Sequence, residues 1–178
     1  MDKTRRAFKK QTAVAGSAEI IAPTIIPSTA FGANDRINAI ELDGDGTLWV
    51  SDALSFGFLN EENNTMTRIK DGLENQERPR LLYKDETNRL WLGTLRGNIY
   101  LVNKDELSVT KIISTPGSLV RSMYANNDEI LVGYDAHGAV TYDLQGNLKK
   151  QIEYSGASEF GIETASIRKI YKDTRGRI

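Results

Sequence analysis

Hydrophobic residues alternate with other residues over short stretches of the chain from about residue 37 onward. In one such stretch, Ile99 and Leu101 alternate with Asn98, Tyr100 and Val102. A period of two favours β-strands, because successive strand side chains point to opposite faces of a sheet. No window of about 12 residues in this part of the chain carries an apolar stripe with helical spacing. The pattern therefore predicts an all-β domain.

The alternating stretches recur as a larger unit. Four copies begin with INAIELDGDGTLWVSD (37–52), PRLLYKDETNRLWLGT (79–94), LVRSMYANNDEILVGY (119–134) and IRKIYKDTRGRI (167–178). Trp49 and Trp91 occupy the same place in the first two copies, whereas Leu131 replaces the tryptophan in the third and Ala125 aligns with the aspartate. The first three copies continue with a segment that a glycine opens and with a final alternating segment, which predicts four strands in each unit.

Four short strands in roughly 40–48 residues are typical of one β-propeller blade. We therefore predict three four-stranded antiparallel blades and the start of a fourth, with repeats at about 35–76, 77–116, 117–164 and 165–178. Closed propellers typically have about 4–8 blades. Residues 34–178 are thus expected to be an incomplete propeller, the N-terminal part of a parent protein that supplies the remaining blades.

Each copy carries a turn signal between its first two strands. A residue that tolerates a positive φ angle recurs there as Gly46, Asn88 and Gly176. An aspartate stands three positions earlier, as Asp43, Asp85 and Asp173. Its carboxylate can accept backbone N–H groups and close a hairpin turn. A cation loop is the alternative for the first copy, where Asp45 supplies a second acid, but that second acid does not recur and the turn is favoured.

The two tryptophans have two possible roles. Trp49 and Trp91 could each stack on a sugar, or could pack in the core between blades. Both are flanked by aliphatic residues in a recurring strand position, which favours core packing.

The loops between the second and third strands supply the candidate ligand-binding residues. In propellers these loops share one face with the connections between blades, so they form a common rim. The candidates at this rim are Asp52, Arg96, Asp135 and His137. His137 could also be a solvated loop residue, which is the more common situation for a lone histidine in a turn.

Composition removes several classes of function. The chain has no cysteine and one histidine, which leaves little material for a metal centre or a nucleophilic site, so we expect no cofactor, no metal and no catalytic residue. A formal net charge of −1 gives no indication of a nucleic-acid partner.

The first residues are expected to direct export. Residues 1–33 comprise a basic head, an apolar stretch and small residues, which is the order of an export signal. Arg5, Arg6 and Phe8 lie in a motif similar to the twin-arginine motif. The leader also resembles that of exported oxidoreductases of the glucose-fructose oxidoreductase type, but no Gly-x-Gly-x-x-Gly follows Asn38, so nicotinamide chemistry is not expected. A periplasmic or otherwise exported bacterial protein is the expectation.

The repeat itself resembles the two-component regulator propeller repeat. Residues 85–94, DETNRLWLGT, match that repeat most closely, and Asp43 to Ser51 match except that Ser51 replaces a glycine. The resemblance implies the periplasmic sensing region of a hybrid histidine kinase, a class linked to polysaccharide sensing. It also implies an oligo- or polysaccharide ligand, a signalling region further along the parent protein, and no catalysis by this part.

A propeller enzyme is the alternative. The repeats also look related to those of streptogramin lyases and gluconolactonases. Such enzymes need convergent acids, asparagines or histidines around a metal or substrate. One histidine and no recurring inward carboxylate argue against that alternative.

Overall fold

The computed structural model describes residues 37–60, 63, 65–69, 71–115, 118–152 and 166–178. Twelve strands form three antiparallel sheets of four strands each, which confirms the all-β prediction and its four-stranded units. None of the described residues belongs to a helix that is long and apolar enough to cross a membrane. The export leader predicted at 1–33, with Arg5, Arg6 and Phe8, lies outside the described residues.

We call the three sheets blades 1, 2 and 3. Blade 1 consists of β1 (Ala39–Leu42), β2 (Leu48–Ser51), β3 (Phe56–Asn60) and β4 (Thr65–Ile69). Blade 2 consists of β5 (Pro79–Lys84), β6 (Leu90–Thr94), β7 (Ile99–Asn103) and β8 (Ser108–Ile113). Blade 3 consists of β9 (Val120–Ala125), β10 (Ile130–Tyr134), β11 (Ala139–Tyr142) and β12 (Leu148–Ile152). Strands that are consecutive in the chain pair with one another in every blade.

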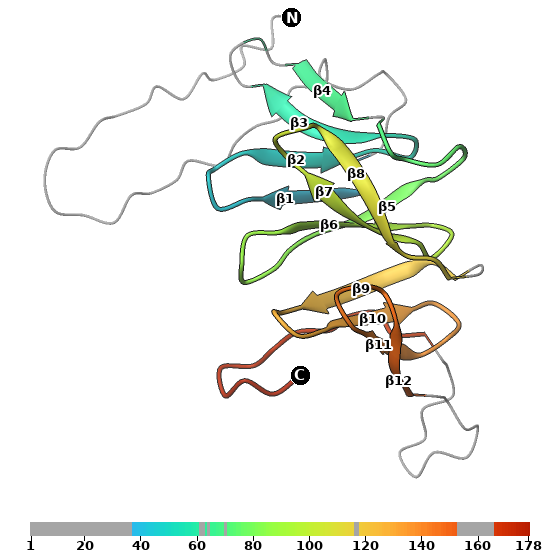
Figure 1. Cartoon of the computed structure of the whole chain (residues 1–178). Coiled ribbons are helices and arrows are strands. Elements are labelled where there is room, and N and C mark those ends of the chain that lie inside the picture. The colour runs from blue at the N-terminus through green and yellow to red at the C-terminus, as the bar shows by residue number, and fades with distance from the viewer. Residues whose placement is uncertain (1–36, 61–62, 64, 70, 116–117, 153–165) are drawn as a thin grey trace, which may run out of the picture.

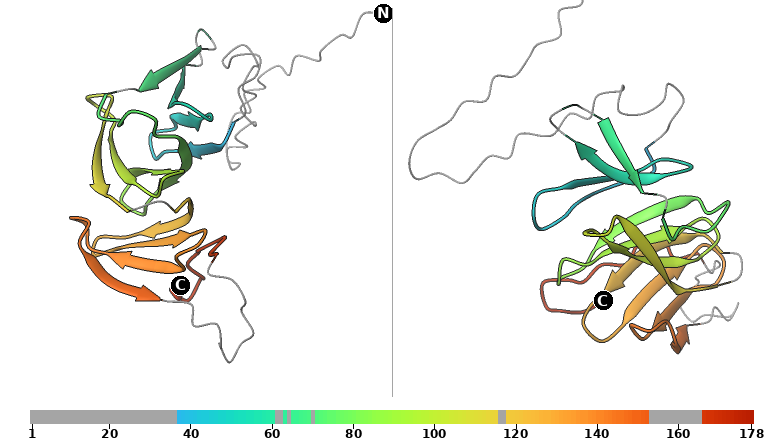
Figure 2. Two further views of the ribbon diagram at one scale, coloured as in Figure 1. Left: turned by 90° about the vertical axis from the view of Figure 1, so that its right-hand side faces the viewer. Right: turned by 45° about the horizontal axis from the view of Figure 1, so that its top comes forward.

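The blades follow one another in chain order as a stack (Figure 1). The inner strands contact one another, β1 with β5 and β5 with β9. The outer strands spread apart, so neighbouring sheets diverge from the inner strands toward the outer strands (Figure 2). This arrangement results from the right-handed twist of each sheet, which rotates the outer strands away from the inner ones.

The two larger hydrophobic clusters lie between blades. One buried cluster joins Trp49 and Phe56 of blade 1 to residues of blade 2 that include Leu92. A second cluster joins Trp91 of blade 2 to residues of blade 3 that include Val132. Leu92 and Trp91 are neighbours on β6, and the alternation of a strand sends them to opposite faces. Blade 2 therefore contributes one face to each of the two cores.

The strand order gives the stack two different ends (Figure 1). The turn end carries the hairpins that join the first strand of each blade to the second and the third to the fourth. The connector end carries the loops between the second and third strands, at 52–55, 95–98 and 135–138, together with the segments that lead from one blade to the next. This is the rim at which the sequence places the candidate binding residues.

The last described segment, residues 166–178, lies against blade 3 without forming a strand. The Ile167 N–H donates to the Tyr134 carbonyl at 2.9 Å, and the Ile170 N–H donates to Ser122 Oγ at 2.6 Å. Asp173 and Gly176 then form the same turn as in the earlier repeats, since the Gly176 N–H donates to the Asp173 carbonyl at 2.9 Å. The segment thus repeats the beginning of a blade.

Candidate functional site

The aspartates at the turn end close the first hairpin of each blade. Asp85 Oδ1 accepts the backbone N–H groups of Thr87 at 2.9 Å and of Arg89 at 3.0 Å. Asp43 Oδ1 accepts the corresponding N–H of Thr47 at 2.9 Å. The φ angles are positive three residues later, 91° at Gly46, 65° at Asn88 and 78° at Gly176. These are hairpins with a residue in the left-handed region, which glycine and asparagine tolerate better than other residues.

The tryptophans are buried and bonded to these aspartates. Trp49 is 2% exposed and Trp91 1% exposed, so neither indole has a face on which a sugar could stack. The Trp49 indole N–H donates to Asp43 Oδ2 at 2.8 Å, and the Trp91 indole N–H donates to Asp85 Oδ2 at 2.9 Å. The two recurring residues of the motif therefore form one buried polar pair, which satisfies an indole donor that packing alone would leave unpaired.

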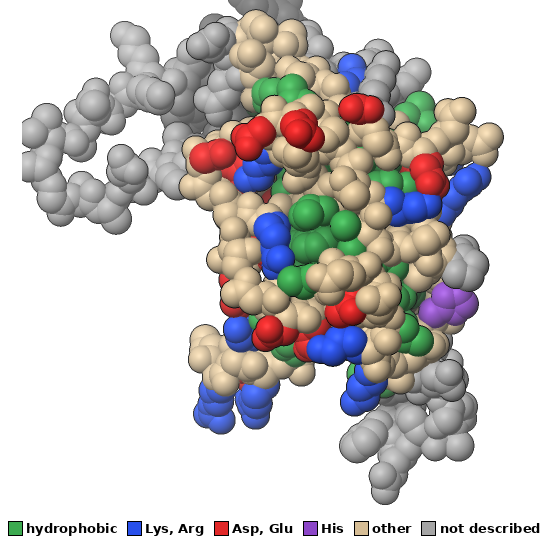
Figure 3. Space-filling model, viewed as in Figure 1, with side chains coloured by type: hydrophobic (Ala, Val, Ile, Leu, Met, Phe, Trp, Pro, Cys, Tyr) green, Lys and Arg blue, Asp and Glu red, His purple; other side chains and the backbone are tan. Residues whose placement is uncertain are grey.

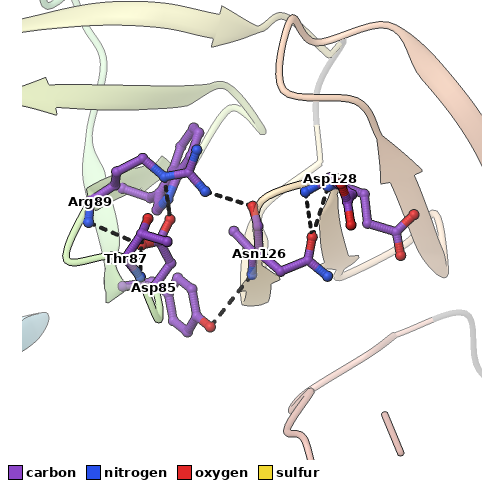
Figure 4. A network of polar contacts seen from close by, with 9 residues as sticks. Asp85, Thr87, Arg89, Asn126 and Asp128 are labelled. Atoms are coloured by element: carbon purple, nitrogen blue, oxygen red, sulfur yellow. Dashed lines mark hydrogen bonds and ion pairs between the residues drawn. The ribbon is translucent and has the colours of Figure 1, made fainter. Parts of the chain in front are cut away.

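The third blade builds its turn from a different residue than the alignment predicts. The sequence aligns Ala125 with Asp85, but Asn126 occupies that place, because this turn is one residue shorter. The Asn126 side-chain oxygen accepts the N–H groups of Asp128 at 2.8 Å and Glu129 at 2.9 Å (Figure 4). The alignment was wrong at this position since it assumed turns of equal length.

Polar contacts at the turn end also join the blades. The Arg89 guanidinium donates to the Asn126 carbonyl at 2.6 Å (Figure 4), and the Gly44 N–H donates to Asn88 Oδ1 at 2.6 Å. Lys104 Nζ of blade 2 lies 2.8 Å from Asp43 Oδ2 of blade 1. The Asp43 carboxylate, the centre of the alternative cation loop, is thus held by donors of the protein on both oxygens.

These contacts lower the pKa of both buried aspartates. Burial alone would raise the pKa of Asp85, but hydrogen bonds from Trp91, Thr87 and Arg89 outweigh it and hold the pKa below its ordinary value. The pKa of Asp43 is also lowered, since side-chain hydrogen bonds with Asp45, Lys104 and Trp49 exceed the opposing effect of burial. Both carboxylates are therefore structural anions at neutral pH.

The four predicted rim residues differ in what they offer a ligand. Asp52 is 3% exposed, and its carboxylate accepts Leu54 N–H, Ser55 N–H and Ser55 Oγ–H at 2.7–2.8 Å, so it closes its own loop. Asp135 accepts Arg121 Nε and Ser166 Oγ, each at 2.9 Å, and both bonds lower its pKa. His137, the single histidine of the chain, lies at the surface beside the ring of Tyr134 (Figure 3). Arg96 is exposed and lines a pocket.

Two adjoining pockets open at the connector end of blade 2. One has a volume of about 440 Å³ and the other of about 510 Å³. Glu77 and Arg96 line both pockets. Leu54 from the loop of blade 1 lines the second pocket together with Leu95 from the loop of blade 2. The structure therefore places the first two of the predicted rim loops around one cavity, with Arg96 in its wall.

A buried acid lines both of these pockets. Glu77 is 5% exposed, and its Oε1 accepts the side-chain N–H of Asn98 at 2.5 Å. Its other oxygen, Oε2, is buried and has no hydrogen-bond partner among the described residues. Asn98 Oδ1 in turn accepts the Thr115 N–H at 3.3 Å. Asn98 thus links the carboxylate of Glu77 to the segment at Thr115.

Charged groups and a tyrosine surround Glu77. Arg96 Nη2 donates to Gln76 Oε1 at 2.9 Å, while Lys111 forms an ion pair with Glu74 in the first pocket. The hydroxyl of Tyr100 is buried close to the Glu74 backbone and the Asn98 side chain. Burial, followed by the charges of Glu77 and Glu74, raises the pKa of Tyr100 to about 12. The tyrosine is therefore neutral at neutral pH.

In blade 3 the position equivalent to Glu77 carries no acid. The Leu95 N–H donates to the Arg78 carbonyl, and the Asp135 N–H donates to the Leu119 carbonyl, which makes Ser118 the counterpart of Glu77 in blade 3. Ser118 Oγ accepts the Ala136 N–H at 3.2 Å, an ordinary loop contact. Sequence reasoning missed Glu77 and Asn98, although comparison of the copies at this position shows an acid where another copy has a small polar residue.

Carboxylates and histidines do not converge elsewhere in the part of the chain that the structure describes. Within it, no group of three or more histidine, cysteine, aspartate or glutamate residues could hold a metal ion. The pocket at Glu77 is thus the candidate site, because a buried carboxylate with one oxygen that is unpaired among the described residues lies there beside charged side chains.

Stacked four-stranded antiparallel sheets, with a core between neighbours and a common connector end, are the blades of a β-propeller. No protein-family model matches the sequence, and no curated protein does either. Solved structures do match.

The extracellular domain of a protein described as a hybrid two component system from B. thetaiotaomicron matches with a TM-score of 0.68 and 16% identity. The match covers 81% of this chain and 20% of that chain. A second such domain from B. thetaiotaomicron matches with a TM-score of 0.58 and 28% identity, over 83% of this chain and 20% of that chain. Virginiamycin B lyase from Staphylococcus aureus matches with a TM-score of 0.58 and 11% identity, over 71% of this chain and 44% of that chain.

The chain therefore resembles the extracellular domains of hybrid two component systems, and it spans about a fifth of the length of the two that it matches.

Proposed function

We propose that this chain is the ligand-binding part of an exported sensor of the two-component type, that it performs no catalysis, and that its ligand is an oligo- or polysaccharide. The ligand binds at the connector end, where the loops of blades 1 and 2 surround the pockets at Glu77. The observation that carries this proposal is the wall of these pockets, to which Leu54, Arg96 and Glu77 come from three separate segments. Binding residues on loops of a rigid sheet scaffold are a common arrangement.

Two further observations support the proposal. The solved structures that resemble this chain include extracellular domains of hybrid two component systems. The pocket lining combines carboxylate, guanidinium, amide and hydroxyl groups with the exposed leucines Leu54 and Leu95, and such a mixture suits the hydroxyl groups and apolar faces of a sugar. The remaining blades and the signalling region belong to the parent protein in this proposal.

Calorimetry on the full chain tests the proposal. A panel of oligosaccharides is titrated into the wild-type chain and into Arg96→Ala. We expect at least one oligosaccharide to bind, and Arg96→Ala to weaken it by about tenfold, the loss of one charge-assisted hydrogen bond. Arg175→Ala, at an exposed turn beside blade 3, is the matched control and should bind like the wild type. Absence of binding to every oligosaccharide in the panel contradicts the proposal.

Export by the twin-arginine route is the second part of the proposal. The basic pair Arg5–Arg6 and the following Phe8 motivate it. Expression in a bacterium that has this pathway should release a mature chain whose N-terminal sequence begins between Ala30 and Asn34. The double substitution Arg5→Lys, Arg6→Lys should retain the chain in the cytoplasm, whereas Lys9→Arg should not.

A propeller enzyme is the second candidate, because virginiamycin B lyase shares the fold. It predicts turnover of a substrate and binding of a divalent metal by the parent protein. Elemental analysis of the purified parent protein distinguishes the two: stoichiometric metal favours the enzyme, and glycan binding without it favours the sensor.

A further inference from the structure

The buried carboxylate of Glu77 lacks a cationic partner among the described residues. Its Oε1 accepts the neutral amide of Asn98, and its Oε2 has no hydrogen-bond partner there. A buried charge that is not paired costs free energy in proportion to its desolvation, and proteins usually neutralise or pair it. The two cations of the first pocket have other partners, since Lys111 contacts Glu74 and Arg96 contacts Gln76.

The carboxylate is placed where a ligand can approach it. Glu77 lines both pockets, so its side chain stands between them. The last side-chain torsion of a glutamate is soft and roughly two-fold, so a rotation presents either oxygen to the cavity. The buried Tyr100 hydroxyl lies close enough for the charge of Glu77 to raise its pKa. A donor group entering the pocket would therefore satisfy an acceptor that the fold leaves open.

Blade 3 serves as an internal reference for this position. Its counterpart of Glu77 is Ser118, a neutral residue that accepts the Ala136 N–H of the loop between β10 and β11. Packing of a blade therefore does not require an acid here. The acid is an addition to the common blade, at the wall of a cavity, and it introduces a cost that a purely structural role does not explain.

We propose that Glu77 binds a positively charged amino group, and that the ligand of the pocket is a saccharide that carries free amino groups. An ammonium group supplies the charge that Glu77 lacks and forms charge-assisted hydrogen bonds, which are stronger than those of a neutral hydroxyl. Arg96 and Asn98 then hold the hydroxyl groups of the same sugar. This inference rests on the proposed function, since it assumes that a saccharide enters the pocket.

A pair of ligands that differ only at the amino group tests the inference. The full chain is titrated with the β-1,4-linked hexamer of glucosamine and with that of N-acetylglucosamine, at about pH 6, where a large share of the amino groups is protonated. We expect the amino hexamer to bind at least about tenfold more tightly. In Glu77→Gln this ratio should fall to about one, because glutamine keeps the shape and an acceptor for Asn98 but lacks the charge.

The matched control is Glu106→Gln. Glu106 is exposed at the turn end, so this variant removes the same charge from the surface without touching the pocket. It should keep the wild-type ratio. Thermal unfolding of Glu77→Gln verifies folding, and its midpoint should equal or exceed that of the wild type, since a buried charge has been removed.

The outcomes separate the two proposals. A ratio that persists in Glu77→Gln, or that falls equally in Glu106→Gln, overturns the inference, because the preference then comes from the general charge of the chain. Binding of neutral oligosaccharides without any preference for the amino hexamer overturns it too and leaves the proposed function standing. Absence of all saccharide binding overturns both.

Discussion

Asp85 performs two roles with its two carboxylate oxygens. One oxygen closes the hairpin by accepting the N–H groups of Thr87 and Arg89, and the other accepts the Trp91 indole and the Arg89 side chain. In blade 3 both members of the buried pair change together, to Asn126 and Leu131. An indole at this place without the carboxylate would leave a buried N–H donor unpaired.

A double-mutant cycle on Asp85 and Trp91 tests this pairing. Asp85→Asn and Trp91→Leu should each destabilise the chain, the second by about 3–5 kcal/mol because it also leaves a cavity. Together they should cost less than the sum, with a coupling of about 0.5–3 kcal/mol. Urea unfolding supplies the free energies. The control cycle combines Asp43→Asn with Trp91→Leu, residues of different turns, and should be additive within about 0.5 kcal/mol.

Acid should remove part of the stability that Asp85 provides. Its pKa in the folded chain lies below the ordinary value of 3.8. A depressed folded pKa means that the contribution is complete above the unfolded pKa and is lost as the pH falls through the folded pKa. The free energy of unfolding of the wild type should therefore decline below about pH 5.

Substitutions of Asp85 and of its donors should reduce this loss of stability in acid to different extents. Asp85→Asn should be less stable at neutral pH but lose less on acidification. Thr87→Val, which removes one donor and keeps the carboxylate, should fall between the two. Urea unfolding at pH values from neutral to about 2 gives the free energy of unfolding of each variant. An equal decrease with falling pH in the wild type and in Asp85→Asn would show that another group is responsible.

At the scale of elements, the connector end is held by close approach of backbones. A Cβ atom at Gly97 would lie 2.6 Å from the Ser118 carbonyl oxygen and 2.6 Å from Thr115 Oγ1. The loop of blade 2 thereby rests directly on the segment that leads to blade 3. Because Gly97 precedes Asn98, this contact also fixes the wall of the pocket at Glu77.

Substitution of two glycines with nearly the same φ angle distinguishes the cost of backbone strain from the cost of steric contact. The φ angle is 94° at Gly97 and 91° at Gly46, but a Cβ at Gly46 would meet nothing within 4 Å. Gly46→Ala should cost about 1–2 kcal/mol from the left-handed conformation alone. Gly97→Ala should cost about 1–3 kcal/mol more, because its neighbours must also move. Equal free energies of unfolding for the two variants would contradict the close approach.

The sequence predicts the blades well because their determinants are local. Alternation specifies the strands, and the aspartate with a glycine or asparagine three residues later specifies the hairpins. The pair of Glu77 and Asn98 could not be predicted this way, since a connector and a loop that are 21 residues apart meet only after the blade has formed. The aspartate–tryptophan bond also escaped, as it depends on the direction of side chains across a hairpin. The turn at Asn126 escaped because its length differs.

At the scale of the whole molecule, protection from solvent differs strongly between a central strand of the middle blade and the outer strand of an end blade. All five residues of β6 in blade 2 are buried, whereas all five residues of β12 in blade 3 are exposed. Blade 2 has a neighbour on each face, and β12 is the outer edge of its sheet. Opening a strand at an edge exposes few apolar contacts and costs little free energy.

Hydrogen exchange should reproduce this gradient. Amides of β6 should exchange slowest, at the rate set by global unfolding, and those of β12 should exchange orders of magnitude faster through local opening. Mass spectrometry of the exchanged chain after peptic digestion measures both segments in one sample. Exchange of β12 as slow as that of β6 would show that the edge is covered in solution.

The two-faced strands have a consequence for how such a chain can change over time. Leu92 and Trp91, adjacent on β6, belong to different cores. A blade exchanged for another copy must therefore pack against two neighbours at once. The residues on the two sides of each interface between blades, here called a seam, must consequently change together. Duplication of blade 2 would require its Leu82 face to pack against its own Leu81 and Tyr83 face. Lineages that gain blades should accordingly show matched substitutions on both sides of each new seam, while the turn aspartates can pass unchanged from copy to copy.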